Sequence, residues 1–349
     1  WVQIPPSAVW HIMIFPAPAK YLLILIAALG LAGCTSHARV VSSEPRLRIL
    51  GTIQDGGLPQ AACTCRNCVA ARKSPSTRRC VASAAIIIPA SQNRNTIYLI
   101  DCSPDIAYQL ELLRDVRPDA KWGRRRPVDG VLLTHAHIGH YLGLAFFGFE
   151  AINARSLDVF ATARMSEYLR SNGPWSQLVK LENIVLHETM PPKEFCLPDW
   201  NTYGVRVQPI LVPHRDEFSD TVAYIIREHE PTRSRQPPAV LFLPDTEPWN
   251  TWREPLLTII EREQITTLLV DGTFFDANDL PDRNVSKIGH PLMVDTMDLL
   301  SPQVSAGRLA VYFIHLNHSN PALDPQSEAS RQIRARGFHV AHEGQEIPL

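Results

Sequence analysis

The sequence predicts an α/β fold in which strands and helices alternate along the chain and pack in layers. Short apolar runs of strand length recur from Leu47 onwards, and helix-like segments separate them. Hydrophobic residues make up 45% of the 349 residues and charged residues 20%, which is typical of a folded globular chain. The 29 prolines indicate many loops and short elements, and they argue against a helical bundle.

The elements follow from these runs. The strand candidates are short apolar segments, many of them rich in β-branched residues: Arg46–Gly51, Ala84–Pro89, Thr96–Asp101, Val128–Thr134, Leu157–Ala161, Val205–Val212, Val222–Arg227, Val240–Leu243, Thr267–Asp271, Arg308–Ile314 and Phe338–Ala341. The helix candidates lie between them: Asp105–Arg114, Gly139–Ala151, Thr162–Ser171, Trp252–Gln264, Pro291–Leu300 and Ser327–Arg336. Pro118–Pro127 and Glu228–Pro238 are expected to be surface loops within one domain.

The N-terminal segment is similar to a bacterial export signal. Lys20 precedes the apolar run Tyr21–Leu31, which is too short to span a bilayer but suits a signal peptide that starts near Met13. The run ends in Leu31–Cys34, which resembles the lipobox of bacterial lipoproteins. We therefore predict a lipoprotein signal peptide over residues 1–33, lipidation of Cys34, a tether over residues 34–45 and one domain over residues 46–349. The alternative is a buried helix that happens to end in Ala-Gly-Cys.

This interpretation places the protein at the membrane of the bacterial cell envelope, because two or three acyl chains on one cysteine anchor a protein durably. Thr35 after the cysteine favours the outer membrane, facing the periplasm, if the host is Gram-negative. The charge balance of 34 Lys and Arg against 35 Asp and Glu predicts no nucleic-acid partner, since such proteins usually carry a basic surplus.

Three histidines follow one apolar strand closely. His135, His137 and His140 lie within six residues, directly after the run that ends at Leu133 and Thr134. Where a strand gives way to a turn and a helix, such side chains can converge on one point. Imidazole is a preferred ligand of zinc and also binds iron and manganese. We therefore predict a metal site here, the alternative being histidines that lie on a loop by chance.

This stretch resembles the His-x-His-x-Asp-His signature of the metallo-β-lactamase superfamily. The resemblance extends to His214 after a strand, to Asp245 in the segment Leu243–Thr246, and to His315 at the end of another strand. It implies a four-layer αββα sandwich with one or two divalent ions (Zn, Mn or Fe). The metal ligands that it implies are His135, His137, His140, His214, Asp245 and His315.

One position departs from the signature, because Gly139 stands where the family has its aspartate. The first metal position keeps His135, His137 and His214 with Asp245. The second keeps only His140, His315 and the shared Asp245. A missing carboxylate weakens a site for a hard divalent ion, so we expect a mononuclear or asymmetric centre, or a dinuclear one completed by water.

His290 is a second catalytic candidate beside Asp245. Val270–Phe274 and Ile288–His290, which precedes a predicted helix, are similar to segments of the RNase Z and cyclic-phosphate phosphodiesterase branch of the superfamily. In that branch the corresponding histidine steadies or protonates the leaving phosphate oxygen. Asp245 is expected to hold the metal and orient the attacking water. The alternative for His290 is an ordinary surface histidine.

Three cysteines, Cys63, Cys65 and Cys68, lie in one short loop after the first strand. Three thiolates and one further ligand make a closed tetrahedral zinc site. The phosphodiesterase branch takes its fourth ligand from a histidine three residues after the last active-site histidine, which implies His318 here. The alternative is a disulfide, since an exported protein meets oxidants. Cys80, Cys102 and Cys196 are expected to be core or strand-end residues, with a disulfide between two of them as the alternative.

Other segments resemble the pyrroloquinoline quinone (PQQ) biosynthesis protein B subfamily: Ile49–Thr52, Gly56–Gln60, Ser103–Ile106 with Gln109, and Asn320-Pro321. That resemblance implies oxidative modification of the PQQ precursor with iron, or transport of PQQ towards the periplasm. The chain keeps the His-x-His signature that standard members of this subfamily have largely lost, and those members are not usually lipoproteins, as this chain is predicted to be.

We therefore expect a metal-dependent hydrolase that acts on phosphodiesters or other esters through a metal-activated water. Its partner would be a small-molecule substrate, anionic in the phosphodiester case, and a homo-oligomer is compatible with the sequence. The role of the PQQ subfamily is the first alternative. A non-catalytic envelope binding protein is the second.

Overall fold

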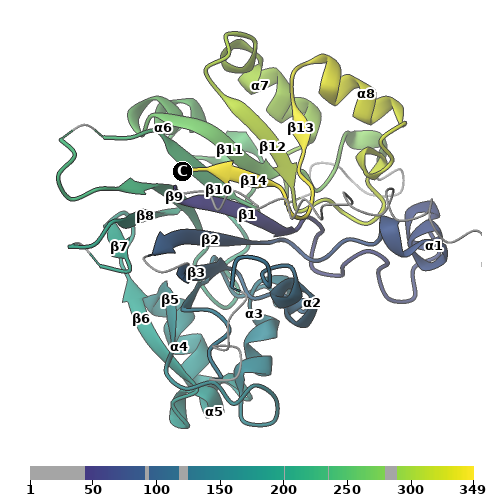
Figure 1. Ribbon diagram of the computed structural model, residues 1–349. Helices are drawn as coiled ribbons and strands as arrows, with labels where there is room; N and C mark the ends of the chain where they lie inside the picture. Colours follow the sequence, from purple (N-terminus) through teal and green to yellow (C-terminus); the bar gives the residue numbers. More distant parts are fainter. Residues whose placement is uncertain (1–43, 91–93, 118–124, 200, 235, 280–288) are drawn as a thin grey trace, which may run out of the picture. The chain divides into compact units, whose positions relative to one another are not determined.

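Two seven-stranded sheets stack face to face between two groups of helices (Figure 1). The computed structural model describes residues 44–349 except 91–93, 118–124, 200, 235 and 280–288, and Ser42–Leu349 belong to one compact unit. The predicted signal peptide, Cys34 and nearly all of the predicted tether lie outside the described residues. No helix in the described part of the chain is long and apolar enough to cross a membrane.

Each sheet is antiparallel at one side and parallel at the other. The first sheet has the order β14 (Glu346–Pro348), β1 (Arg46–Gly51), β2 (Ser83–Ala90), β3 (Arg94–Ile100), β4 (Gly130–Leu132), β5 (Leu157–Thr162) and β6 (Ile184–Thr189), and it is parallel from β3 to β6. The second has the order β13 (His339–Val340), β12 (Ala310–Ile314), β11 (Ile265–Asp271), β10 (Ala239–Leu243), β9 (Val222–His229), β8 (Gly204–Leu211) and β7 (Phe195–Leu197), and it is parallel from β10 to β13.

The helices are short and divide between the outer faces of the two sheets (Figure 1). The first sheet packs against α2 (Ile106–Glu111), α3 (Ile138–Tyr141) with the 3-10 segment Leu142–Phe147, α4 (Ala163–Ser171) and α5 (Trp175–Lys180). The second packs against α6 (Leu256–Arg262), α7 (Met293–Ser305) and α8 (Glu328–Ala335). Helix α1 (Arg66–Lys73) follows β1 in the chain.

Three hydrophobic clusters fill the three interfaces between these layers. Ile87 and its neighbours pack against the helices of the first sheet, whereas Ile86, one residue earlier, faces the second sheet. Tyr224 and Phe242 meet Ile86 in the cluster between the sheets, and Leu241 faces α6 and α7. Alternation with period two thus buries both faces of each sheet. The predicted αββα sandwich is confirmed.

The predicted strands all occur, but several elements were not predicted. Strands β6, β7 and β14 are at sheet edges, where fewer residues need to be apolar; the burial of β6, for example, is confined mainly to its two ends. Helices α1 and α5 are short segments with few buried residues. The helix predicted over 139–151 is wrong in part, because only Ile138–Tyr141 is α-helical before a 3-10 segment and a turn.

The histidine-bearing helix α3 is fixed to the end of β3 by backbone contacts. The Cys102 amide donates to the carbonyl of His140 at 2.8 Å, and the Gly143 amide donates to the carbonyl of Cys102 at 2.9 Å. A methyl group on Gly143 would lie 2.1 Å from the carbonyl oxygen of Ser103. Only glycine therefore allows this close approach.

Gly143→Ala should destabilise the fold by about 1–3 kcal/mol, because the methyl group forces α3 away from the β3 end. Denaturant unfolding measures the change in the free energy of unfolding. Gly173→Ala is the matched control, since its added methyl group meets no atom within 4 Å. Equal stabilities of the two variants would contradict this account of the packing.

Candidate metal centre

The candidate site lies where strands of both sheets end. His135 follows β4, His214 follows β8, Asp245 follows β10 and His315 follows β12. The carboxyl ends of neighbouring parallel strands meet at one edge of a sheet, and in this stack the two edges adjoin. Asp101 and His315, directly after their strands, have left-handed φ values of 61° and 63°. Such backbone is uncommon outside glycine and concentrates at functional sites.

Four ligand groups surround the first metal position. His135, His137, His214 and Asp245 offer ligand atoms that all lie within 4.8 Å of one another. His214 Nε2 is 3.1 Å from both His137 Nδ1 and Asp245 Oδ2, and His135 Nε2 is 3.4 Å from the same carboxylate oxygen. Two imidazoles on one tetrahedral zinc ion place their nitrogens about 3.3 Å apart. The spacing of these four groups fits one ion.

A second group adjoins the first through Asp245. The Nε2 atoms of His140 and His315 lie 4.0 Å and 3.9 Å from Asp245 Oδ2. The carboxylate of Asp55, which the sequence did not indicate, also has an oxygen within 4.8 Å of the ligand atoms of His140 and His315. Asp55 was missed because it lies far in sequence from the histidines of this cluster, although it directly precedes the glycine pair Gly56-Gly57.

Two similar relays of threonine and aspartate orient the histidine rings. His140 Nδ1 donates to Asp101 Oδ2 at 2.7 Å. The Thr134 hydroxyl donates to Asp101 at 2.9 Å, which leaves its oxygen to accept from His135 Nδ1 at 2.9 Å. Each Nδ1 therefore points its proton outward, and each Nε2 faces the centre, where a metal ion can bind it.

The second sheet repeats this arrangement. The Thr273 hydroxyl donates to Asp271 Oδ1 at 2.7 Å and lies 3.2 Å from His315 Nδ1. The Nε2 atoms of His135, His140 and His315 are buried, and they make no hydrogen bond to any described residue. Unpaired buried nitrogens are costly, and metal ions at the two positions would satisfy all three.

The charge states of the main ligands also suit a cation. Burial, and then the neighbouring His140, hold the pKa of His135 well below its usual value, so this ring is neutral. Burial alone would raise the pKa of Asp245, but His315, His290 and His214 outweigh it and keep the carboxylate ionised. Neutral imidazole and ionised carboxylate are the forms that bind metal ions. His140 is the exception, because burial opposes its proton but Asp101 outweighs burial and raises the pKa to about 9, so a metal ion bound at Nε2 would displace a proton.

His290 lies beside this centre and contacts two carboxylates. Its Nδ1 is 2.8 Å from Asp271 Oδ2 and 3.2 Å from Asp245 Oδ1. Burial would lower the pKa of His290, but Asp271 and Asp245 outweigh it and raise the pKa well above its usual value. His290 is therefore no ordinary surface histidine. It holds a proton within reach of the shared carboxylate.

The cysteine loop forms a separate cluster. The Sγ atoms of Cys63, Cys65 and Cys68 lie 3.4, 3.5 and 3.6 Å from His318 Nδ1. A tetrahedral zinc ion with Zn–S of about 2.3 Å and Zn–N of about 2.0 Å places sulfur and nitrogen about 3.5 Å apart. These groups therefore fit one zinc ion. The described cysteines, which also include buried Cys80, Cys102 and Cys196, are all free thiols.

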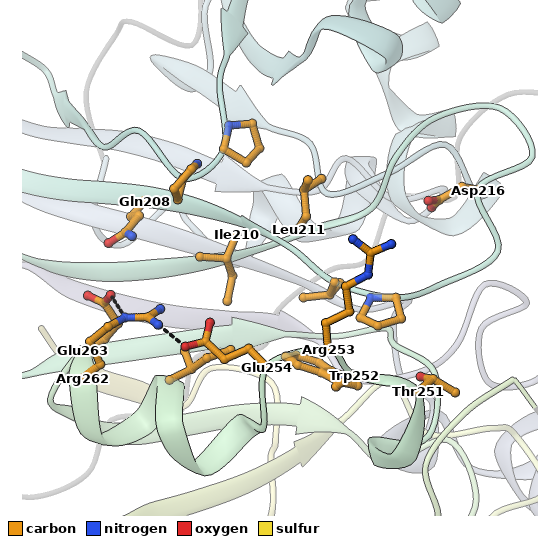
Figure 2. Close-up of a pocket in the computed structure, with 15 residues that line it drawn as sticks. Gln208, Ile210, Leu211, Asp216, Thr251, Trp252, Arg253, Glu254, Arg262 and Glu263 are labelled. Atoms are coloured by element: carbon orange, nitrogen blue, oxygen red, sulfur yellow. Dashed lines mark hydrogen bonds and ion pairs between the residues drawn. The ribbon is translucent and has the colours of Figure 1, made fainter.

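A cavity of about 750 Å³ lies next to the histidine cluster, between β8 and α6 (Figure 2). Its wall includes Val212 and Pro213, which precede His214, and Trp252, whose indole donates to Thr246 at 3.1 Å. Arg262 joins Glu254 and Glu263 along one side (Figure 2). None of the described ligand residues lines this cavity, so it adjoins the candidate centre without containing it.

Comparison with known proteins gives a family and a fold. The chain matches the beta-lactamase superfamily domain over residues 96–316. Coenzyme PQQ synthesis protein B of Rhodopseudomonas palustris is 26% identical over 321 residues, which cover 87% of this chain and 99% of that protein. The protein of the same name from Nitrosococcus oceani is 25% identical over 327 residues, with the same coverage.

Two solved structures share the fold. Zinc-bound PqqB from Methylobacterium extorquens superposes with a TM-score of 0.67 at 20% identity, covering 87% of this chain and all of that one. A diphosphatase from the PhnP family superposes with a TM-score of 0.57 at 18% identity, covering 88% of this chain and 97% of that one.

Thr134→Val should weaken metal binding at the histidine cluster by about 10–100-fold, because His135 loses the hydroxyl that orients its ring. Titration of metal-free protein with zinc measures the dissociation constant. Thr189→Val is the matched control, since its buried hydroxyl makes no hydrogen bond to a described residue. Affinities equal in both variants would show that the relay does not orient the ligand.

Cys63→Ser should remove one zinc ion per chain and leave the metal at the histidine cluster bound, because the two clusters share no ligand. Metal analysis of purified protein gives the count. Cys196→Ser, a buried thiol outside both clusters, should retain all the zinc. An unchanged zinc content in Cys63→Ser would refute the four-ligand site.

Proposed function

Because this chain belongs to the beta-lactamase superfamily, we propose that it is a metal-dependent hydrolase of phosphodiesters or related esters. The attacking group would be a water molecule activated at the histidine cluster. The substrate would be a small anionic molecule. The cysteine cluster would hold a structural zinc ion with no open position for substrate.

The observation that carries this proposal is the convergence of unpaired buried nitrogens on one carboxylate. His135, His140 and His315 are at most 2% exposed, and each directs a free Nε2 towards Asp245. Catalytic zinc sites keep one coordination position open for water or substrate and can expand to five ligands, and here Asp245 is shared between the two metal positions. A divalent ion held there lowers the pKa of bound water and polarises a phosphoryl oxygen.

The chain's own residues supply the remaining steps. Asp245 Oδ2 faces the ligand nitrogens, and Oδ1 faces His290, so this carboxylate can accept a hydrogen bond from the attacking water and fix its direction. His290 keeps its proton through Asp271 and can deliver it to the leaving oxygen as the ester bond breaks. After that transfer the two carboxylates favour renewed protonation of His290.

A charged imidazole at this place also favours an anionic substrate. The raised pKa of His290, caused by Asp271 and Asp245 against the effect of burial, makes it a cation at neutral pH. The leaving oxygen of a phosphodiester carries growing negative charge as its bond breaks, and a positioned proton donor contributes about 10²–10⁴-fold to such a step.

The second candidate function is that of the relatives named Coenzyme PQQ synthesis protein B. It is favoured by a similarity that covers 99% of those proteins at 26% identity. With iron in the histidine cluster, the chain would oxidise a precursor of the quinone, or it would carry the quinone. The lipid anchor at Cys34 remains a prediction that would place either activity at the cell envelope.

His290→Ala should lower the turnover of diphenyl phosphate by about 100-fold, because the leaving phenolate then departs without a proton. The loss should be much smaller with bis(p-nitrophenyl) phosphate, whose leaving group needs little protonation. Steady-state kinetics of the zinc-loaded enzyme with both esters measure this difference. His187→Ala is the control. This exposed histidine lies on the edge strand β6, pairs with Asp158 and belongs to none of the ligand groups.

Equal losses with both esters would remove the acid role of His290. If the zinc-loaded protein hydrolyses neither ester while the iron-loaded protein consumes oxygen with a quinone precursor, the second candidate replaces the first. If neither form reacts, both catalytic candidates are contradicted.

A further inference from the structure

The carboxylate of Asp55 fills the space beside Gly139. A Cβ atom built on Gly139 would lie 2.2 Å from Asp55 Oδ1 and 2.8 Å from Asp55 Cα. The Gly139 amide donates to the same Oδ1 at 2.9 Å. Residue 139 therefore has no room for a side chain, because a carboxylate from another part of the chain already stands there.

This carboxylate also faces the two histidines of the second metal position. Asp55 Oδ1 is 3.9 Å from His140 Nε2, and the ligand atoms of Asp55, His140 and His315 all lie within 4.8 Å of one another. Both histidines are fully buried, and neither Nε2 has a hydrogen-bond partner in the described chain. Two unpaired nitrogens and one carboxylate thus face the same point.

We propose that Asp55 is the carboxylate ligand of a second metal ion, which His140, His315 and the shared Asp245 complete. This inference rests on the proposed metal-dependent function and adds a ligand to it. It also changes the interpretation of Gly139. In this proposal the metal position has not lost its carboxylate ligand, because the absence of a side chain at Gly139 leaves room for the carboxylate of Asp55 from the loop after β1.

The loop that carries Asp55 is fixed to the strand end that carries His315. The Gln54 amide donates to the carbonyl of Leu316 at 2.9 Å, and the Leu316 amide donates to the carbonyl of Thr52 at 2.9 Å. The Asn317 side chain donates to Gln54 Oε1 at 2.7 Å. Asp55 therefore has a defined place relative to His315, as a metal ligand requires.

A purely structural role for Asp55 would use only its hydrogen bond to the Gly139 amide. An asparagine can make that hydrogen bond through its carbonyl oxygen, but it lacks the negative charge that a hard divalent ion favours. The substitution Asp55→Asn therefore separates the two roles, because it keeps the contact with Gly139 and removes the charge.

The test counts zinc ions in the full chain. Wild-type protein loaded with zinc should hold three ions, of which one is in the cysteine cluster and two are at the histidines. Asp55→Asn should hold two, with the second histidine-site ion bound at least tenfold more weakly. Asp105→Asn is the matched control, because Asp105 also accepts from a backbone amide, that of Val81 at 2.8 Å, but belongs to no ligand group.

Gly139→Ala is a second variant that leaves every ligand in the sequence. Its methyl group would displace the Asp55 carboxylate, so it should lose the same ion as Asp55→Asn. The zinc in the cysteine cluster should stay in both variants and shows that they are folded. In crystals of the zinc-loaded wild type, anomalous scattering should place the second ion about 2.0–2.2 Å from an Asp55 oxygen.

The outcomes separate this inference from the proposed function. If wild type holds two histidine-site ions and both variants keep them with unchanged affinity, Asp55 is no ligand, and the hydrolase proposal stands. If wild type holds one histidine-site ion, the second position is not a site, and the inference falls alone. If wild type holds no ion at the histidines, the inference and the proposed function fall together.

Discussion

The pairing of the segment after β1 with the segment after β12 is the constraint on which the candidate site depends. Ile53 and Gln54 pair with Leu316 through the backbone, and this joins an antiparallel strand of one sheet to a parallel strand of the other. The same two segments carry Asp55 and His315, which face each other across the second metal position. Cys63, Cys65 and Cys68 lie further along the first segment, and His318 lies further along the second. A zinc ion in the cysteine cluster would therefore link the same two segments at a second place.

Buried charge explains why the interior of this site favours a cation. Asp101, Asp245 and Asp271 are at most 3% exposed, and isolated carboxylates are costly to bury. Asp101 and Asp271 each accept from a threonine hydroxyl and a histidine, so their charges are compensated locally. Asp245 has histidines around it, and His140, whose pKa is raised to about 9, keeps a proton while no metal ion is bound. A divalent ion at the second position would take the place of that proton on His140 Nε2, while His290 would keep its own proton through Asp271. Metal binding at this centre is therefore coupled to the release of protons.

Sequence patterns predicted the parts of this protein that are local in the chain. The central strands are continuous apolar runs because both of their faces are buried. The edge strands β6 and β14 were not predicted because they are less fully buried and less continuously apolar. The clustered histidines and cysteines pointed to two metal sites, since their chemistry is readable over a few residues. Asp55 could not be found in this way. Its partners His140 and His315 lie 85 and 260 positions further along the chain, and only the stacking of two sheets brings the three together. Gly139, taken alone, indicated a lost ligand. The sequence shows that the aspartate of the family signature is absent, but it does not show that the carboxylate of Asp55 occupies the same space.

A ligand supplied by a different segment changes how the two metal positions depend on the rest of the fold. The first position takes its ligands from the ends of β4, β8 and β10, which the sheets hold directly. The second takes Asp55 and His315 from two segments outside the strands, whose alignment depends on a few backbone hydrogen bonds. An aspartate at position 139 would have placed its carboxylate on α3, next to His140, and would have left only His315 dependent on that alignment. With Asp55 instead, separation of these two segments would displace Asp55 and His315 from the second ion, while the first ion keeps all of its own ligands. The two metal positions thus differ because the carboxylate of Asp55 comes from the loop after β1 instead of from α3.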